Sequence, residues 1–594
     1  MKPILTSILL FTVSTLACQA FVLSTDPEKK HPIKWDFSGT STLVDPNVFD
    51  RITKTIRYYI AEDAFTEANR EAELNAVKSS FDQWEAVPDT NIRFDYVGLA
   101  PADIDAITDN TNAVFWTKST KISDGREDLS FAAGAALCEL VAPSNLAGEI
   151  TGDFIVKECD IALNGLLTWF TDPTLENNPS KMVEGFMLHE IGHLLGIRHS
   201  PVGASSMFHL GGPGLTTLAG LSADEVLAAQ FLYPTKDFNF GSIHGTITKN
   251  GEPVLGAMVF LEDSDGNIIS GSATEEDGSY EFLAVPGGDY KVWSSPVYSL
   301  DSSFFLIVGL QIKNPEFFEA DTQFLPTEKL PVSLTGGETA TQDFQVNQGI
   351  SSRLPIFIRS ASADPFLFVQ ESVPTTIKQG TQNVSVGLFF EEELPENAIL
   401  EISGNDITLS DQTTGLLDFT VVQFHHISAV VSVAEDAKPG IRTFKVTFGD
   451  EIVYANGFLE ILPAFPDYNF DGVDDLFQRD FWPLFTTAEA DPDLDPDEDG
   501  LTNKEESIAG TNPLDGASIL EIDRTAYSLD GAVIEWKGRS GNKYQLMTKD
   551  AVEGVWVPLD APFIAETDDN GIISFQDSSA DGRVRFYQVV ALSR

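Results

Sequence analysis

The chain has few basic side chains: 37 Lys and Arg stand against 90 Asp and Glu among 594 residues, and the formal net charge is −53. Nucleic acids and anionic membranes are negative too, so this charge argues against either as the main partner. It is compatible with solubility, with halotolerance, or with oxygen-rich sites for hard cations such as calcium. The apolar fraction of 42% excludes a wholly disordered acidic protein. The length is typical of about three to five domains.

Long apolar runs are confined to the N-terminus. Lys2 precedes an apolar stretch from Ile4 to Ala17, and Cys18-Gln-Ala20 ends in a small residue that suits signal-peptidase cleavage. The run is too short for a comfortable membrane span, and no later segment approaches about 18 continuous apolar residues. We therefore expect a signal peptide over residues 1–20 and a secreted, soluble mature chain without an integral membrane segment. The alternative is a lipoprotein anchored through Cys18.

Cysteine is scarce as well, with three in the chain, and only Cys138 and Cys159 lie beyond the expected signal peptide. In an oxidising compartment this even number predicts one disulfide bond. The alternative is two unpaired buried thiols. In either case the chain is not a small scaffold held together by disulfides.

Residues 21–235 have the pattern of a mixed α/β domain. Apolar residues recur at helical spacing before Trp84, and Pro179 suits the first position of a helix. Ser222 and Glu225 form a capping-box pattern at the start of another helix. The predicted elements are a helix over 61–87, a strand over 91–97, strands over 153–156 and 160–163, a helix from about 179 to 196, and a helix from 222 to about 233.

From residue 239 the pattern changes to short strands separated by Gly, Asn, Asp and Pro, which is typical of β-sandwiches. The motifs Gly241-x-Ile-x-Gly245, Asp277-Gly-x-Tyr280 and Gly288-x-Tyr290 resemble those of the prealbumin-like module called carboxypeptidase-regulatory-like. The expected regions are a carboxypeptidase-regulatory-like β-sandwich over 239–348, an Ig-like β domain over 352–465, acidic loops over 467–515 and a small β module over 516–594.

The most informative segment is His189-Glu190-Ile-Gly-His193-Leu-Leu-Gly-Ile-Arg-His199, which contains three of the chain's eight histidines. His189 and His193 are four residues apart, so on a helix their imidazoles project from one face and can bind one metal ion. The second glycine ends the helix and lets the chain return with His199 as a third ligand. Three imidazoles with an open fourth position are typical of a catalytic zinc, since structural zinc is normally closed by four protein ligands.

Glu190 adjoins the first ligand and suits the role of general base. A bound zinc ion lowers the pKa of its water to about 7 and polarises a scissile carbonyl. Glu190 would take a proton from that water and pass it to the leaving amine. The segment therefore predicts hydrolysis of internal peptide bonds.

This extended motif resembles that of the metzincin metalloproteases, and its surroundings are similar to the matrixin (matrix-metalloprotease-like) branch. Ser200 follows the third histidine, and Met207 stands in a segment that resembles the Met-turn beneath the zinc in that family. The resemblance covers about 30–235. It implies an α/β domain with a twisted sheet and three helices, one catalytic zinc ion, and protein or peptide substrates.

Three departures limit the resemblance. His209 stands where astacin- and serralysin-like relatives have a tyrosine ligand, which argues against those branches. The cysteine-switch propeptide of animal matrixins has no counterpart before Trp35, so latency through a thiolate is not expected. Residues 131–164 contain no obvious histidine ligands for a second, structural zinc. Calcium or the Cys138–Cys159 disulfide would then stabilise residues 131–164 in place of that zinc.

The acidic segment contains two loops with calcium-ligand spacing. In the second, the predicted ligands are Asp495, Asp497, Asp499, the carbonyl of Leu501, Asn503 and a bidentate Glu506. The first opens in the same way, with Asp467, Asn469, Asp471 and Asp475 as predicted ligands. Gln478 occupies its last position, so weaker binding is expected there. The pair resembles dockerin or thrombospondin-type-3 calcium repeats. The alternative is a solvated acidic linker.

The sequence thus favours a multidomain protein in which a metzincin-like catalytic domain precedes several β-sandwich modules. Its predicted function is that of a secreted zinc-dependent endopeptidase acting on extracellular proteins, with calcium as a structural ion. The alternative is a cell-surface adhesion or glycan-binding protein with a secondary or degenerate metzincin domain. The β modules carry no glycan-binding signature, and fold alone does not decide function. The intact Glu190 favours the enzyme.

Overall fold

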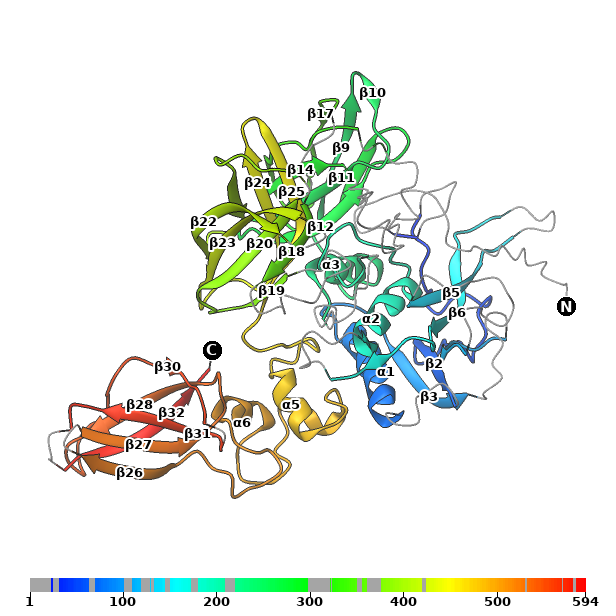
Figure 1. The fold of residues 1–594 in the computed structure, drawn as a ribbon. Helices are drawn as coiled ribbons and strands as arrows, with labels where there is room; N and C mark the ends of the chain where they lie inside the picture. Colours follow the sequence, from blue (N-terminus) through cyan, green and yellow to red (C-terminus); the bar gives the residue numbers. More distant parts are fainter. Residues whose placement is uncertain are drawn as a thin grey trace. The chain divides into compact units, whose positions relative to one another are not determined.

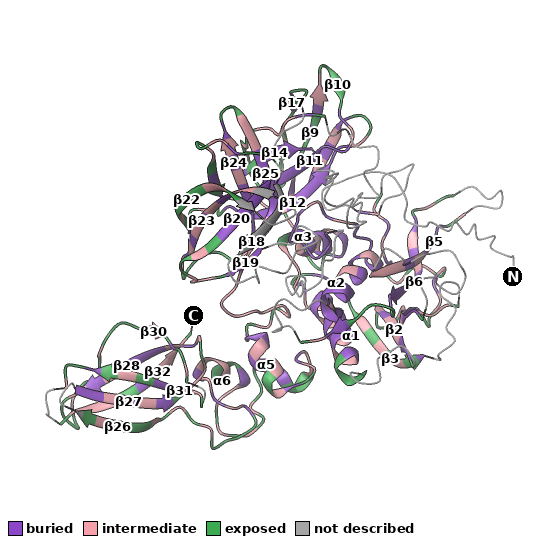
Figure 2. Ribbon diagram, viewed as in Figure 1, coloured by how far each residue is buried: buried purple, intermediate pink, exposed green. Residues whose placement is uncertain are grey.

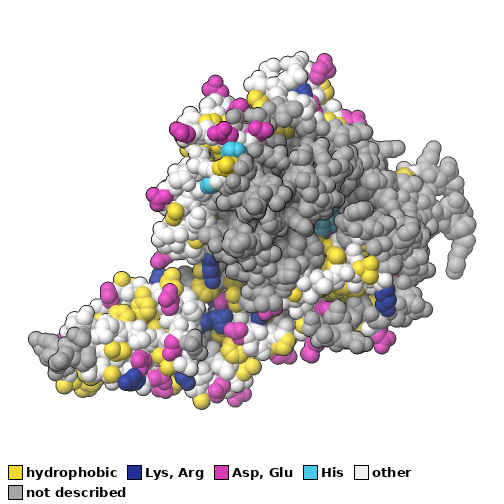
Figure 3. All heavy atoms as spheres, viewed as in Figure 1, with side chains coloured by type: hydrophobic (Ala, Val, Ile, Leu, Met, Phe, Trp, Pro, Cys, Tyr) yellow, Lys and Arg dark blue, Asp and Glu magenta, His cyan; other side chains and the backbone are white. Residues whose placement is uncertain are grey.

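In the computed structural model, residues 1–463 form one compact unit and residues 464–594 form another. The structure describes residues 23–24, 31–62, 70–100, 109–118, 129, 133–144, 150–172, 180–208, 220–296, 321, 323–349, 355–360, 375–390, 392–418, 423–528, 531–568, 570–580 and 584–593. Within these ranges, no helix is both long and apolar enough to cross a membrane. On the face drawn in Figure 3, acidic side chains are scattered over the described surface.

A six-stranded sheet forms the first part of the larger unit (Figure 1). Its strands lie in the order β1-β2-β4-β6-β5, and β2 also pairs with β3. The pairs β2–β3, β2–β4 and β4–β6 are parallel, whereas β5 is antiparallel to β6. The strands are β1 Phe49–Asp50, β2 Thr55–Ala61, β3 Phe94–Ala100, β4 Ala113–Trp116, β5 Gly134–Val141 and β6 Ile155–Leu163.

Three helices accompany this sheet: α1 Arg70–Glu85, α2 Val183–Leu194 and α3 Ala223–Leu232. α1 buries Phe81 and Trp84, and the indole Nε1 of Trp84 donates a hydrogen bond to the Leu188 carbonyl of α2 at 3.0 Å. A buried indole nitrogen needs an acceptor, so this bond fixes the two helices against each other. α3 begins with the predicted capping box of Ser222 and Glu225.

Two helices begin later than the sequence predicts. α1 starts at Arg70 rather than at residue 61, since β2 extends to Ala61, and residues 63–69 lie outside the described part. α2 starts at Val183. The two residues before it form β8 (Lys181–Met182), which pairs in parallel with β7 (Trp169–Phe170). The predicted start at Pro179 lies outside the described residues.

Two strand predictions need correction. A single strand, β6, replaces the two predicted over 153–156 and 160–163. Its middle is polar, but the buried Glu158 accepts hydrogen bonds from the backbone N–H groups of Asp109 and Asn110, at 3.0 and 2.9 Å. Because a distant loop satisfies this carboxylate, the strand continues through it. The other strand, β3, begins at residue 94 rather than at 91.

Residues 241–346 contain two sheets around one hydrophobic core. β9 pairs with β10, β13, β16 and β17, and the second sheet has the order β12-β11-β14-β15. Ile243 and Tyr280 from the first sheet meet Val259 and Val292 from the second. The strands are β9 Gly241–Lys249, β10 Glu252–Pro253, β11 Met258–Glu262, β12 Ile268–Ala273, β13 Ser279–Val285, β14 Gly288–Ser295, β15 Leu330–Leu334, β16 Thr339–Thr341 and β17 Phe344–Val346.

Residues 355–462 again form two sheets, with the orders β18-β20-β23-β22 and β19-β25-β24-β21. Leu388 and Val431 from one sheet share a core with Phe444 and Leu459 from the other, and both sheets carry many buried residues (Figure 2). The strands are β18 Pro355–Ser360, β19 Thr375–Lys378, β20 Val384–Phe390, β21 Ile399–Ile402, β22 Ile407–Asp418, β23 Gln423–Val433, β24 Gly440–Phe448 and β25 Glu451–Leu462. The carboxypeptidase-regulatory-like and Ig-like assignments of these two regions stay predictions.

The smaller unit contains both acidic loops, the short helices that follow them, and two small sheets. The sheets have the orders β26-β27-β31 and β29-β28-β30, and β32 also pairs with β28. Trp536 and Tyr544 lie in their common core. The elements are α5 Asp475–Phe481, the 3₁₀ helix η4 Ala488–Ala490, α6 Asn503–Ala509, β26 Ile522–Ser528, β27 Gly531–Lys537, β28 Lys543–Lys549, β29 Val557–Pro558, β30 Phe563–Ile564, β31 Ile572–Asp577 and β32 Phe586–Leu592.

Candidate metal centres

The three histidines of the zinc motif converge. His189 and His193 lie on α2, His199 follows the helix, and one ring nitrogen from each lies within 4.8 Å of the others. The ring centroids are 4.8–5.2 Å apart. Gly196 has φ +93°, a left-handed conformation that suits glycine and turns the chain after the helix. The structure therefore brings together the three ligands predicted from spacing.

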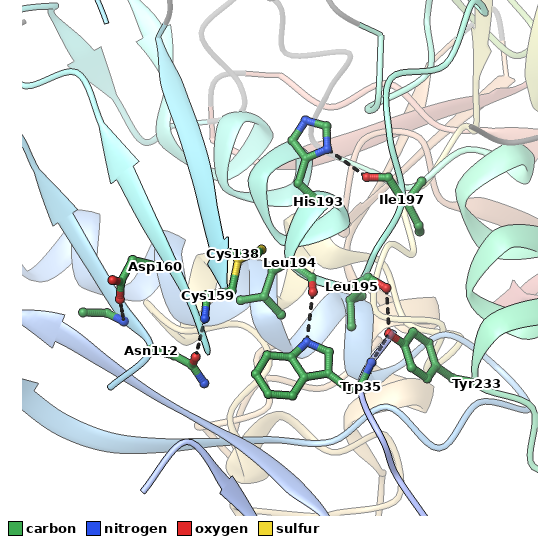
Figure 4. The surroundings of a disulfide bond; sticks show 11 residues. Trp35, Asn112, Cys138, Cys159, Asp160, His193, Leu194, Leu195, Ile197 and Tyr233 are labelled. Atoms are coloured by element: carbon green, nitrogen blue, oxygen red, sulfur yellow. Dashed lines mark hydrogen bonds between the residues drawn. A yellow bond between two sulfur atoms is a disulfide. The ribbon is translucent and has the colours of Figure 1, made fainter. Parts of the chain in front are cut away.

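Backbone carbonyls orient two of these imidazoles. His189 Nδ1 lies 2.7 Å from the Ser206 carbonyl. His193 Nδ1 lies 2.8 Å from the Ile197 carbonyl, a contact drawn in Figure 4. Because a carbonyl only accepts, each Nδ1 carries the proton, and each Nε2 keeps a lone pair for a metal. Two imidazoles held in this way, together with that of His199, fit zinc.

Residues from distant parts of the chain cap the turn that carries His199. Trp35 Nε1 donates to the Leu194 carbonyl at 2.9 Å, and the Tyr233 hydroxyl donates to the Leu195 carbonyl at 2.6 Å (Figure 4). These two carbonyls belong to the end of α2, where helix carbonyls lack partners within the helix. Sequence reasoning missed both caps, because no local pattern links positions this far apart.

Glu190 lies on the buried side of α2, with 3% of its surface exposed. Its Oε2 atom has no hydrogen-bond partner among the described residues. Burial raises the pKa of its carboxyl to about 8, and a hydrogen bond from the Ala136 backbone partly opposes that shift. Gly134 on β5 makes room for the side chain, since a Cβ at that position would lie 2.7 Å from Glu190 Oε1.

Met207 is buried directly against α2. A Cβ at Gly192, between the two helical histidines, would lie 2.3 Å from the Met207 sulfur, so only glycine allows this approach. The Met207 amide donates to Glu225 Oε1 at 3.1 Å. Sequence reasoning identified Glu225 only as a helix cap and missed this second contact. His209 lies outside the described residues.

Cys138 and Cys159 face each other across β5 and β6 and form a disulfide bond (Figure 4). The Cys159 amide also donates to Asn112 Oδ1 at 2.8 Å. The disulfide therefore ties the edge strand β5 to the rest of the sheet. β5 is the strand that carries Gly134 and Ala136 beside Glu190.

In the second acidic loop, several side-chain oxygen atoms lie close together without a hydrogen-bond donor among the described residues. Carboxylate oxygens of Asp495, Asp497 and Asp499 lie within 4.8 Å of one another. Five buried oxygens in this loop have no hydrogen-bond partner in the described part of the chain: Asp495 Oδ1, Asp497 Oδ2, Asn503 Oδ1 and both carboxylate oxygens of Glu506. Buried oxygens of this kind are costly unless they are satisfied, and a hard dication satisfies several at once. The donor set therefore fits calcium.

The first acidic loop has a different arrangement. Gln478 Nε2 and Asn469 Nδ2 donate to Asp471 Oδ2 at 2.7 and 2.9 Å. The Gly472 amide donates to Asp467 Oδ2 at 3.0 Å. The amide of Gln478 thus lies where the twelfth-position carboxylate would bind an ion. Calcium binding by Asp467, Asn469, Asp471 and Asp475 stays a prediction.

Three family models match parts of the chain. The matrixin family (Peptidase_M10) matches residues 50–234, the bacterial TSP3 repeat matches 495–516, and a protein family of unknown function (DUF1416) matches 237–295. No curated protein matches the chain.

Among solved structures, two chains described as marsupial T cell receptor are similar to it at 10% and 8% identity. Each match covers 36% of this chain, and the matches cover 92% and 61% of the receptor chains. Their TM-scores of 0.11 and 0.10 are too low to bear on the fold. The family matches support a matrixin-like domain, and with it a zinc metalloprotease in general, together with a TSP3 repeat that indicates calcium binding.

Proposed function

We propose that the chain is a secreted zinc endopeptidase that hydrolyses internal peptide bonds of extracellular proteins. The observation that carries the proposal is the convergence of the three imidazoles of α2 and the following turn beside the buried Glu190. Three imidazole ligands leave a fourth position for water or a substrate carbonyl, which is typical of catalytic zinc. The matrixin match over 50–234 supports the same chemistry.

When bound, zinc supplies a water with a pKa of about 7 and a Lewis acid for the substrate carbonyl. Glu190 accepts a proton from the attacking water through Oε2, the atom without a protein partner among the described residues, and delivers it to the leaving amine. Burial alone raises the pKa of this carboxyl to about 8. The positive charge of a nearby dication would keep it ionised as a base.

Secretion and a structural calcium ion complete the proposal. The N-terminal apolar run and the Cys138–Cys159 disulfide support an extracellular location. The loop at 495–506 leads into α6, whose last carbonyls accept hydrogen bonds from Asn542, just before β28, and from Tyr544 of β28. We therefore assign calcium the role of stabilising residues 464–594.

Casein cleavage by the purified full-length protein tests the mechanism. We expect 1,10-phenanthroline to abolish cleavage. Glu190→Gln keeps the shape of the side chain but removes the base, so kcat should fall by about 10²–10⁴-fold while bound zinc stays near one ion per chain. Glu71→Gln, an exposed acid of α1, is the control and should leave kcat unchanged.

Full activity of the Glu190→Gln protein, or a wild-type chain that binds no zinc, would contradict the proposal. Binding to cells or glycans without any proteolysis would instead favour the adhesion alternative.

A further inference from the structure

The segment between the third zinc ligand and the Met-turn is enclosed by strands from the two β regions that follow the catalytic part. Val202, Ala204 and Met207 are each no more than 2% exposed. Val202 and Ala204 belong to one apolar cluster with side chains from β11, β14 and β24, among them Phe260, Trp293 and Ile441. Val202 and Ala204 are therefore covered by β strands of the same unit rather than by solvent.

Polar contacts fix the position of this segment. The Gly203 amide donates to the Asn456 carbonyl of β25 at 3.2 Å, and Trp293 Nε1 of β14 donates to Asn456 Oδ1 at 3.0 Å. Ser200, next to the third ligand, donates through its hydroxyl to Asp224 Oδ2 at 2.7 Å. A chain of hydrogen bonds thus joins both β regions to the segment.

The fit is close enough to require glycines on both sides. A Cβ at Gly203 would lie 2.8 Å from the Phe458 ring, and a Cβ at Gly271 of β12 would lie 2.6 Å from the Pro201 ring. The rings of Phe208 and Phe458 meet edge to face, with centroids 5.7 Å apart. Interiors this tightly packed transmit small displacements, so a shift of either β region moves the segment.

A half-buried acid of β25, Glu460, has one buried carboxylate oxygen and lies within electrostatic range of Glu225. Burial and repulsion from Glu225 raise the pKa of Glu460 to about 8. Glu225 is the carboxylate that accepts from the Met207 amide. The repulsion between Glu460 and Glu225 agrees with the packing and the hydrogen bonds in placing β25 close to the Met-turn.

We infer that β12 and β25 are positioning elements of the zinc site: through Gly271, Asn456 and Phe458 they hold residues 200–208, and with them His199 and Met207, in the geometry that binds the metal. The inference rests on the proposed zinc site. It gives the two β regions a role in catalysis that differs from spacing, tethering or substrate binding.

Two substitutions in the full-length protein test this inference by opposite means. Gly271→Ala adds a methyl group against Pro201 in a strand whose backbone alanine tolerates, and Phe458→Ala removes the ring that packs against Phe208. The control is Gly387→Ala in β20, where the nearest atom to an added Cβ is a ring carbon of Phe389 at 3.3 Å, away from the segment.

The readouts are the zinc dissociation constant, measured by competition with a chromogenic chelator, and the visible spectrum of the cobalt-substituted protein. Outer contacts of metal ligands typically change affinity by about 10–100-fold. We expect a rise of at least about ten-fold in the dissociation constant for Gly271→Ala and Phe458→Ala, with an altered cobalt spectrum, and less than about two-fold for Gly387→Ala.

Near-UV circular dichroism checks that each variant is folded. If the Gly271→Ala protein does not fold, the zinc affinity and cobalt spectrum of Phe458→Ala alone test the inference. Wild-type zinc affinity, cobalt spectrum and casein cleavage in a folded Phe458→Ala protein would overturn the inference. A wild-type protein that binds no zinc would instead refute the proposed function, so the two failures are distinguishable.

Discussion

The two acidic loops of the smaller unit share a backbone design and differ in one decisive residue. Both place glycine at the sixth position in the left-handed region, Gly472 with φ +79° and Gly500 with φ +100°. In both, the amide of that glycine donates to the first aspartate at 3.0 Å. At the twelfth position, however, one loop has Gln478 and the other has Glu506.

This difference decides whether the loop needs an external cation. The Gln478 amide donates to Asp471, so a neutral N–H group satisfies that acidic oxygen. Glu506 cannot donate when ionised, and both of its buried oxygens lack partners among the described residues. The same turn geometry can therefore be closed by side-chain amides, as with Asn469 and Gln478, or by a metal ion, as proposed for the loop with Asp497 and Glu506.

Removal of calcium has the largest expected effect, and it falls on the second loop. With EGTA the melting temperature of the smaller unit should drop by on the order of 10 °C, since a bound ligand stabilises the folded state by mass action. Hydrogen–deuterium exchange of the full chain should accelerate in α6 and β28, which are joined by the Asn542 and Tyr544 hydrogen bonds. Equal acceleration in α5 would show that the two loops do not differ.

Glu506→Gln makes the second loop resemble the first. Loss of the bidentate ligand should weaken calcium binding by on the order of 100-fold, measured by isothermal titration calorimetry. Glu505→Gln is the matched control, because that neighbouring side chain is exposed and bonds the Thr502 backbone. If both substitutions weakened binding equally, general acidity rather than ligand geometry would explain the affinity.

Gln478→Glu is the converse change and should create a second calcium site. The variant loses the hydrogen bond that the Gln478 side-chain amide donates to Asp471. It gains a carboxylate at the position that Glu506 occupies in the other loop. Calcium stoichiometry should rise from one to two ions per chain, with a dissociation constant of about 10⁻⁴–10⁻³ M, as in extracellular modules. Gln478→Ala removes the amide without adding a ligand, so its stoichiometry should remain one.

The local parts of both candidate sites could be predicted from sequence, because the ligands lie within one short segment in each case. Helical periodicity alone places His189 and His193 on one face, and alternation in a tight loop places Asp495, Asp497 and Asp499 around one point. The capping box of α3 is similarly local.

The supporting contacts could not be predicted, since they join positions far apart in the chain. Nothing near Trp35 indicates that its indole caps the end of α2, and nothing near Asn456 indicates a bond to Gly203. The continuous strand β6 was missed for a related reason. Its charged Glu158 does not look like part of a buried strand, and the backbone of Asp109 and Asn110, far away in the chain, satisfies it.

The pH dependence of the calcium-free protein gives a smaller but more specific test of the second loop. Burial, together with repulsion from its three aspartates, raises the pKa of the Glu506 carboxyl from 4.5 to about 7. Between these values the folded chain holds a proton that the unfolded chain has released. Stability from this group is therefore fully present below pH 4.5 and is lost as pH rises through 7.

In EGTA, the melting temperature of wild type should therefore fall relative to that of Glu506→Gln as pH rises from 4.5 to 7. The glutamine variant is the matched reference, because its side chain has the same shape and does not titrate. With saturating calcium the trend should reverse in wild type, since the ion binds the carboxylate form and the proton competes with it. Parallel curves for the two proteins in EGTA would mean that the Glu506 carboxyl ionises as easily in the folded chain as in the unfolded chain, and this would contradict a need for calcium in the second loop.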